Sequence, residues 1–168
     1  MTESMQTLIA SDQTYVVMGL GETGLSVIAH LYSLGKSVVA FDSRTDKFNL
    51  DELRSAFPGV QFVQAQDAEH WIGPNSIWVV SPGVALTDTL VVRAREAGSE
   101  ILGDLDLFMQ AVDVPVAGIT GFNGKSTVTT LVAQMLLASG FKAAAGGNLS
   151  PAALKLLNDG SERYVIEM

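Results

Sequence analysis

Short apolar runs alternate with longer amphipathic runs along the whole chain, and glycine or proline separates many of them. The short runs have the length of strands, and the longer runs space their apolar residues as a helix with one buried face does. In the front part of the chain, strands are predicted at residues 15–18, 37–41, 60–63, 76–80 and 100–102. The helices predicted there are 22–34, 51–57, 87–97 and 104–111.

The same alternation continues in the rear part, with predicted strands at residues 114–119, 141–145 and 163–168 and predicted helices at 125–139 and 151–157. Strands that alternate with helices predict an α/β fold with a parallel sheet, whose ligands bind at the carboxyl ends of the strands. We expect a Rossmann-like domain in residues 1–112, followed by a P-loop NTPase-like domain in residues 113–168. The rear set has too few helices to cover both faces of its sheet, so we expect only the first part of that domain.

A phosphate-binding loop is predicted where the first rear strand meets its helix, in the segment GITGFNGKST at residues 118–127. Glycines let backbone N–H groups turn towards phosphate oxygens, and the helix N-terminus adds partial positive charge. The strict pattern G-x-x-x-x-G-K-[ST] fails, because its first glycine would fall at Ile119. The segment still predicts that the chain binds a nucleoside triphosphate, as ATP, with Lys125 reaching the β- and γ-phosphates and Ser126 placing its hydroxyl on Mg²⁺. The candidate phosphate contacts are Gly118, Thr120, Gly121, Asn123, Gly124, Lys125, Ser126 and Thr127.

Glu167 is the candidate partner of Ser126 at the metal. It follows the apolar run Tyr164, Val165 and Ile166, so it stands at the end of a predicted strand. Triphosphate sites commonly hold Mg²⁺ with a carboxylate in that position.

A second glycine motif, GLGETG at residues 19–24, follows the first predicted strand and opens the first predicted helix. Asp42 ends the next strand, 18 residues after Gly24. Both features suit a dinucleotide, which favours a nicotinamide-dependent oxidoreductase if the motif is taken alone. A UDP group presents a diphosphate equally well, and a tight turn without a ligand also satisfies the pattern.

Composition narrows the class of protein. Hydrophobic residues make up 48% and charged residues 17%, which favours a packed globular chain over a disordered one. The net charge is −8 and the acidic residues gather in the front part, so we expect no nucleic-acid or membrane binding. The chain has no cysteine, residues 1–14 lack the features of a signal peptide, and no run is long enough to span a membrane, so we expect a cytoplasmic protein.

Taken together, the two motifs resemble the Mur ligases, the ATP-dependent amino-acid-adding enzymes of peptidoglycan synthesis, and most closely their D-glutamate-adding members. The resemblance covers essentially the whole chain. It is carried by GLGETG at 19–24, DSR at 42–44, SPG at 81–83, GDLDLF at 103–108, ITGFNGKSTVTTLV at 119–132, GGN at 146–148 and YVIE at 164–167.

The resemblance implies that the front domain binds UDP-N-acetylmuramoyl-L-alanine. The implied substrate contacts are Gly21, Glu22, Thr23 and Gly24 at the diphosphate, Asp42, Ser43 and Arg44 at the uracil, and Ser81, Pro82, Gly83 and Asn148 along the same cleft. The implied catalytic residues are Lys125, Asn148 and Glu167. Phosphate passes from ATP to the substrate carboxylate, and the amine of D-glutamate displaces it from the resulting acyl phosphate. D-glutamate would be bound by a domain absent from this chain, so we expect an inactive portion of a monomeric enzyme.

Two residues depart from the family pattern: Phe122 replaces a small polar residue, and Ser150 replaces a glycine. We interpret His30 and His70 as packing or surface residues. A stand-alone nucleotide-binding module remains an alternative, and a folylpolyglutamate synthase-like ligase is disfavoured because those enzymes lack a UDP domain.

Overall fold

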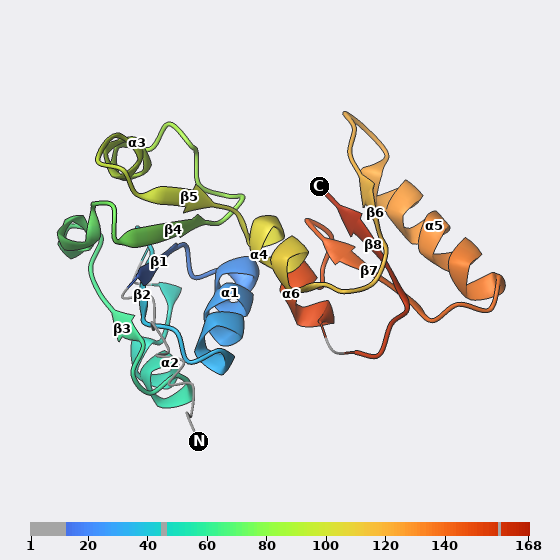
Figure 1. Cartoon of the computed structure of the whole chain (residues 1–168), viewed down its shortest axis with the longest axis horizontal. Helices are drawn as coiled ribbons and strands as arrows, with labels where there is room; N and C mark the ends of the chain where they lie inside the picture. Colours follow the sequence, from blue (N-terminus) through green and yellow to red (C-terminus); the bar gives the residue numbers. More distant parts are fainter. Residues whose placement is uncertain (1–12, 45–46, 158) are drawn as a thin grey trace, which may run out of the picture.

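A computed structural model describes residues 13–44, 47–157 and 159–168, so most of the segment expected to lack a signal peptide lies outside the described residues. The chain forms two parallel sheets that lie side by side (Figure 1). The first sheet has the strand order β3-β2-β1-β4-β5. Its strands are β1 (Thr14–Met18), β2 (Val38–Phe41), β3 (Gln61–Phe62), β4 (Ser76–Val80) and β5 (Glu100–Leu102).

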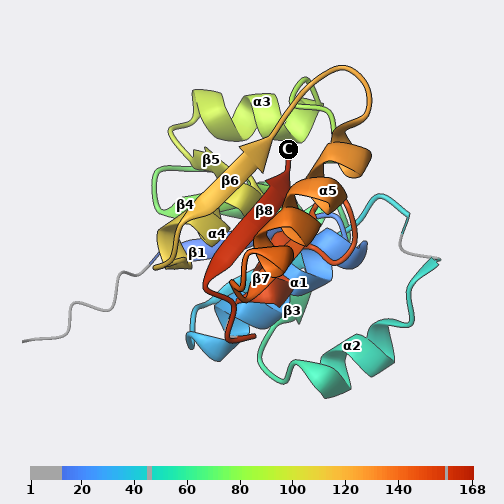
Figure 2. The same cartoon turned by 90° about the vertical axis from the view of Figure 1, so that its right-hand side faces the viewer.

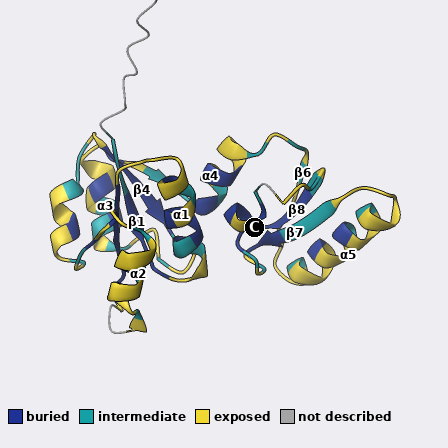
Figure 3. Cartoon of the chain, turned by 90° about the horizontal axis from the view of Figure 1, so that it is seen from below, coloured by how far each residue is buried: buried dark blue, intermediate teal, exposed yellow. Residues whose placement is uncertain are grey.

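Helices cover both faces of the first sheet, as the sequence predicts. Successive residues of β1 point to opposite faces, so Val17 packs in one apolar cluster and Val16 in the other. The helices α1 (Glu22–Ser33) and α4 (Asp104–Ala111) contribute to the Val17 side, and α3 (Thr89–Glu96) with the 3₁₀ helix η2 (Asp67–Trp71) to the Val16 side. The remaining helix between the strands of the first sheet is α2 (Leu50–Ala56). Figure 3 shows the buried residues concentrated on the strands of the first sheet.

The second sheet has the order β6-β8-β7, and Figure 2 shows β8 (Arg163–Glu167) between β6 (Val116–Ile119) and β7 (Ala143–Gly147). Helix α5 (Lys125–Ala138) packs on β7 and β8. We call the first sheet with its helices the front unit, and the second sheet with its helices the rear unit. The short helix α6 (Ala153–Leu156) packs on β7 and also contacts α1 and α4 of the front unit. The parallel α/β fold class is therefore confirmed, and the described residues contain no helix long and apolar enough to cross a membrane.

The two units share one apolar core. Leu154 and Leu156 of α6 and Tyr164 and Ile166 of β8 belong to the same cluster as the residues of α1 and α4. The rings of Phe108 and Tyr164 meet edge to face with their centroids 5.5 Å apart. The predicted boundary at 112/113 falls in the connection between α4 and β6, and the division into two domains stays a prediction.

Several element bounds differ from the sequence prediction. The two glycines before Asn148 predict a turn at residues 146–148. Strand β7 nevertheless extends to Gly147, because both glycines pair with β8. Helix α3 begins at Thr89, because the side chain of Asp88 caps it by accepting from the Leu90 amide at 2.9 Å. Helix α6 begins only at Ala153, and η2 has no counterpart in the prediction.

Candidate functional site

A cleft of about 660 Å³ opens at the carboxyl ends of β1, β2 and β4. It is where a parallel sheet of this kind is expected to bind its ligand. The structure brings every predicted substrate contact to this cleft. The residues lining it are Met18, Gly19, Gly21, Glu22, Thr23, Gly24, Asp42, Ser43, Arg44, Ser81, Pro82, Gly83, Val84 and Asn148.

The glycine motif sets the N-terminus of α1 against the cleft. A Cβ on Gly24 would lie 1.8 Å from the carbonyl oxygen of Gly19, so only glycine allows the strand and helix to approach this closely. Gly19 has a φ of +108°, which side-chain-bearing residues rarely adopt. Helix α1 then begins at Glu22, and its first backbone N–H groups, which have no partner within the helix, border the cleft. This arrangement suits an anion.

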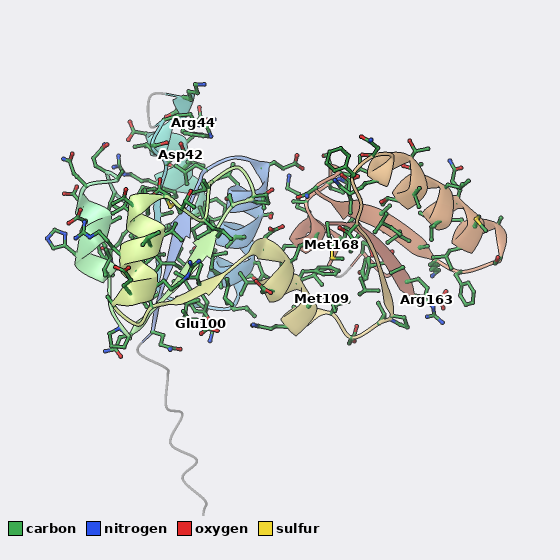
Figure 4. The ribbon with its side chains drawn as sticks, turned by 90° about the horizontal axis from the view of Figure 1, so that it is seen from above. Asp42, Arg44, Glu100, Met109, Arg163 and Met168 are labelled. Carbon is green, nitrogen blue, oxygen red and sulfur yellow. The ribbon has the colours of Figure 1, made fainter. Side chains whose placement is uncertain are left out.

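Asp42 ties the glycine turn to the end of β2. Its Oδ2 accepts a hydrogen bond from the Leu20 amide at 2.9 Å, and its Oδ1 accepts from the amide and the Nε of Arg44 at 2.8 and 3.2 Å. Figure 4 shows Asp42 and Arg44 beside each other. Burial raises the pKa of Asp42, but the hydrogen bonds from Leu20 and Arg44 outweigh it and leave the pKa below its ordinary value. The carboxylate is therefore charged and fixed at neutral pH.

The SPG turn forms the opposite wall. The Ser81 amide donates to the Met18 carbonyl at 3.1 Å, and the Val84 amide donates to the Ser81 carbonyl at 2.9 Å. A Cβ on Gly19 would lie 2.8 Å from the Ser81 hydroxyl oxygen, so a larger residue at position 19 would force the Ser81 side chain to move.

Asn148 reaches the cleft from the rear unit. It follows β7, and its backbone N–H group donates to the Glu167 carbonyl at 3.0 Å. A Cβ on Gly146 would lie 2.2 Å from the Pro151 carbonyl oxygen, and one on Gly147 would lie 2.4 Å from that of Glu167. The two glycines before Asn148 are thus required for the close approach that places it at the cleft.

The predicted phosphate loop lies apart from this cleft, between β6 and α5 (Figure 1). Gly124 precedes the helix in the left-handed conformation with a φ of +73°, and Gly121 has a φ of +153°. The Nζ of Lys125 donates to the Gly121 carbonyl at 3.2 Å, so the lysine folds over the loop. Phe122 at the loop tip is 99% exposed. Gly118 lies within β6 and pairs with Ile166.

Glu167 is buried at the end of β8, beside Ile119, the residue that leads into the phosphate loop. Its Oε2 has no hydrogen-bond partner among the residues that the structure describes. A buried carboxylate oxygen without a partner is costly unless a cation or water satisfies it, so this atom fits a metal ligand. Among the described residues, no three His, Cys, Asp or Glu side chains gather as a metal site. Mg²⁺ here would therefore depend on phosphate and water oxygens besides Glu167 and Ser126.

The structure also shows a contact that the sequence did not predict. The Oε1 of Glu22 accepts hydrogen bonds from Nζ of Lys155 at 3.1 Å and from Oγ of Ser150 at 3.2 Å. Lys155 was not a candidate in the sequence. The only available signal was Ser150, which stands where the resembled family has a glycine.

The two histidines lie outside the cleft. His30 is on α1, and burial lowers its pKa. His70 is in η2, with Nδ1 at 2.7 Å from the Asp67 carbonyl oxygen.

Known proteins resemble this chain in fold and in sequence. A solved pseudomurein peptide ligase type C from Methanothermus fervidus matches 92% of this chain and 32% of its own, with a TM-score of 0.54 and 22% identity. That likeness shows the fold alone, a parallel α/β arrangement found in a peptide ligase. Residues 13–103 match the family model for the N-terminal domain of MurD-like Mur ligases. The chain therefore belongs to the Mur ligase family, in its MurD-like group, which confirms the resemblance read from the motifs.

Named relatives agree. The UDP-N-acetylmuramoylalanine–D-glutamate ligase of Marinobacter nauticus is 41% identical over 162 residues, 96% of this chain and 36% of the relative. The enzyme of the same name from Legionella pneumophila (strain Paris) is 42% identical over 145 residues, 86% of this chain and 32% of the relative. The chain spans about a third of the length of the curated relatives it matches.

Proposed function

We propose that this chain supplies the UDP-substrate cleft and the phosphate loop of an ATP-dependent ligase that adds D-glutamate to UDP-N-acetylmuramoyl-L-alanine. The observation that carries the proposal is the single cleft on which all the predicted substrate contacts converge, including Asn148 from the rear unit. The names of the relatives at about 40% identity support the same activity. Since the chain spans about a third of their length, we expect it to bind ligands without ligating by itself, as a monomer in the cytoplasm.

In this proposal the first turn of α1 holds the diphosphate, because its backbone N–H groups and partial positive charge face the cleft. The uracil lies at Asp42, Ser43 and Arg44, where Asp42 fixes the backbone and side chain of Arg44. The SPG turn closes the other side. Asn148 then meets the substrate from the rear unit, so one ligand would touch both units.

The rear unit would hold ATP and Mg²⁺. The backbone of residues 120–124 and the N-terminus of α5 would hold the phosphates, with Lys125 at the β- and γ-phosphates, and Ser126 and Glu167 at Mg²⁺. Bound ATP would supply the phosphoryl group that turns the substrate carboxylate into an acyl phosphate, from which the amine of D-glutamate displaces phosphate. Such a transfer depends on positioning and on neutralised charge, which these residues can provide.

Two rivals use the same motifs. A nicotinamide-dependent oxidoreductase would use the glycine turn for a dinucleotide, and a nucleotide-binding module would use it without chemistry. The oxidoreductase has no need of a second, separate phosphate loop. The buried, unpartnered Glu167 oxygen beside that loop favours a metal-assisted reaction over simple binding.

The test is thermal unfolding of the chain with UDP or NADH. We expect saturating UDP to raise the unfolding temperature, since a ligand at 100 times its Kd adds about 2.7 kcal/mol of stability, and NADH to have no effect. Lys125→Ala is the matched control, because Lys125 does not line the cleft and the UDP response should survive its removal. In a protein with the full length of the relatives, the same substitution should abolish ligation. A rise with NADH alone would overturn the proposal.

A further inference from the structure

A carboxylate stands at the place where the proposed function puts a diphosphate. Glu22 is the first residue of α1, and it lines the cleft with Gly21 and Thr23. A free carboxylate there would repel a bound diphosphate and would compete with it for the N-terminus of the helix. The cleft is therefore suited to an anion only if this charge is held elsewhere.

In the structure this carboxylate is bound by two donors that do not line the cleft. Lys155 of α6 and Ser150, which lies between β7 and α6, both donate to the Oε1 of Glu22 from the rear unit. The hydrogen bond from Lys155, and after it the one from Ser150, lowers the pKa of Glu22, so the acid remains charged at neutral pH. Its charge is balanced by the ammonium group of Lys155.

We propose that Lys155 and Ser150 are positioning residues, which hold the Glu22 carboxylate away from the diphosphate subsite and leave the backbone N–H groups of α1 free for the anionic part of the ligand. The inference rests on the proposed function, because it assumes a diphosphate in the cleft. It also gives the serine at position 150 a role. A glycine there could not donate the hydrogen bond that Ser150 makes.

The experiment measures the Kd of UDP and of uridine for the chain by calorimetric titration. In Lys155→Met the Glu22 carboxylate loses its balancing charge, and we expect UDP to bind roughly three- to tenfold more weakly while uridine is unaffected. Lys36→Met is the matched control. It removes the same charge from an exposed lysine outside the cleft, so it should leave the affinity for UDP unchanged within about twofold.

A second variant separates charge from folding. Glu22→Gln removes the repelling charge, so it should bind UDP about two- to threefold more tightly than the wild type. In the Glu22→Gln background, Lys155→Met should weaken UDP binding far less than it does alone, because the two side chains act as a pair.

Three results would overturn the inference. Equal weakening of UDP and uridine by Lys155→Met would show a merely structural role. Weaker UDP binding by Glu22→Gln would show that the carboxylate contributes to binding. A wild-type chain that binds uridine but gains nothing from the diphosphate would remove the inference together with the diphosphate subsite and leave the uridine part of the cleft standing. A chain that binds neither would remove the whole of the proposed function.

Discussion

At the scale of single residues, Asp42 links the glycine turn to Arg44 at the end of β2 through three hydrogen bonds. The side-chain carboxamide of an asparagine would place an N–H group against a donor, either the Leu20 amide or the amide and guanidinium of Arg44. We expect Asp42→Asn to lower the free energy of unfolding by about 2 kcal/mol, the usual range for lost hydrogen bonds to a buried charge. Chemical denaturation measures this. Asp51→Asn is the control, because that carboxylate is 92% exposed and its loss should cost no more than about 0.5 kcal/mol.

The pH dependence of this difference has a definite sign. The pKa of Asp42 in the fold lies below the ordinary value of 3.8, so its charged form stabilises the fold above about pH 4. The advantage of wild type over Asp42→Asn should therefore be full at neutral pH and should shrink as the pH falls below 4. A difference that grew on acidification would contradict the assignment.

The sequence identified Asp42 because an acid at the end of a parallel strand lies at a known edge of the sheet. It could not identify Lys155, whose partner Glu22 is 133 positions away in the chain. Nothing in the local pattern distinguishes that lysine from any other on a helix. Contacts between exposed side chains of separate units depend on how the units dock, and local periodicity carries no information about docking.

At the scale of elements, β8 shows how a strand can be predicted while its contacts are not. Its apolar run predicts a strand, and the structure places that strand, buried, at the centre of the second sheet. The hydroxyl of Tyr164, however, lies 2.9 Å from the Leu156 carbonyl and 3.1 Å from Oδ1 of Asp159, so the strand also fixes the end of α6. By contrast, η2 has no apolar periodicity to reveal it, and the glycines of β7 appear as a turn because their pairing with β8 is long-range.

Tyr164→Phe tests that contact. Removing the hydroxyl breaks its hydrogen bonds to the Leu156 carbonyl and to the Asp159 carboxylate, and leaves that carbonyl only the longer bond from the Asp159 amide at 3.3 Å. We expect a loss of about 1–2 kcal/mol in the free energy of unfolding at neutral pH. Burial, and then the hydrogen bond with Asp159, raises the pKa of Tyr164 to about 12. A raised pKa means that the neutral hydroxyl stabilises the fold below about pH 10, and that this is lost as the pH rises towards 12.

Denaturation series at pH 7 and from pH 9 to 11.5 would measure both effects. The advantage of wild type over Tyr164→Phe should be constant up to about pH 10 and should decline above it. Tyr32→Phe serves as the control at neutral pH, because Tyr32 is 40% exposed on α1 and its hydroxyl has little to lose. An unchanged advantage at pH 11.5 would remove the buried hydroxyl from the argument.

At the scale of the whole molecule, the two sheets are joined by α6, which packs on β7, α1 and α4. Two sets of alternating strands and helices are readable from the sequence, but a core shared between them is not. Periodicity shows which face of α6 is apolar without showing what covers it. The same limit applies to α5, where Leu131 and Met135 are more than half exposed and only Thr129 and Ala133 are buried.

Because the core is shared, a cavity in the rear unit should destabilise the front unit. Leu154 of α6 is 6% exposed, and Leu154→Ala should cost about 2–4 kcal/mol, lowering the unfolding temperature by roughly 5–15 °C. Both tryptophans, Trp71 and Trp78, lie in the front unit, so their fluorescence reports its unfolding. We expect the fluorescence midpoint to fall together with the circular dichroism midpoint, in one cooperative transition.

The matched control is Leu131→Ala, in the same unit but 53% exposed, which should shift both midpoints by no more than a few degrees. Independent units would behave differently: Leu154→Ala would split the circular dichroism transition and leave the tryptophan midpoint where it was. That result would reduce the contact of α6 with α1 and α4 to a surface docking. Asn148 would then be held at the cleft only by β7, which it follows, and by the contact of Ser150 and Lys155 with Glu22. A coincident shift instead means that the rear unit carries Asn148 to the cleft on a rigid, buried support, which is what the proposed binding of one substrate by both units requires.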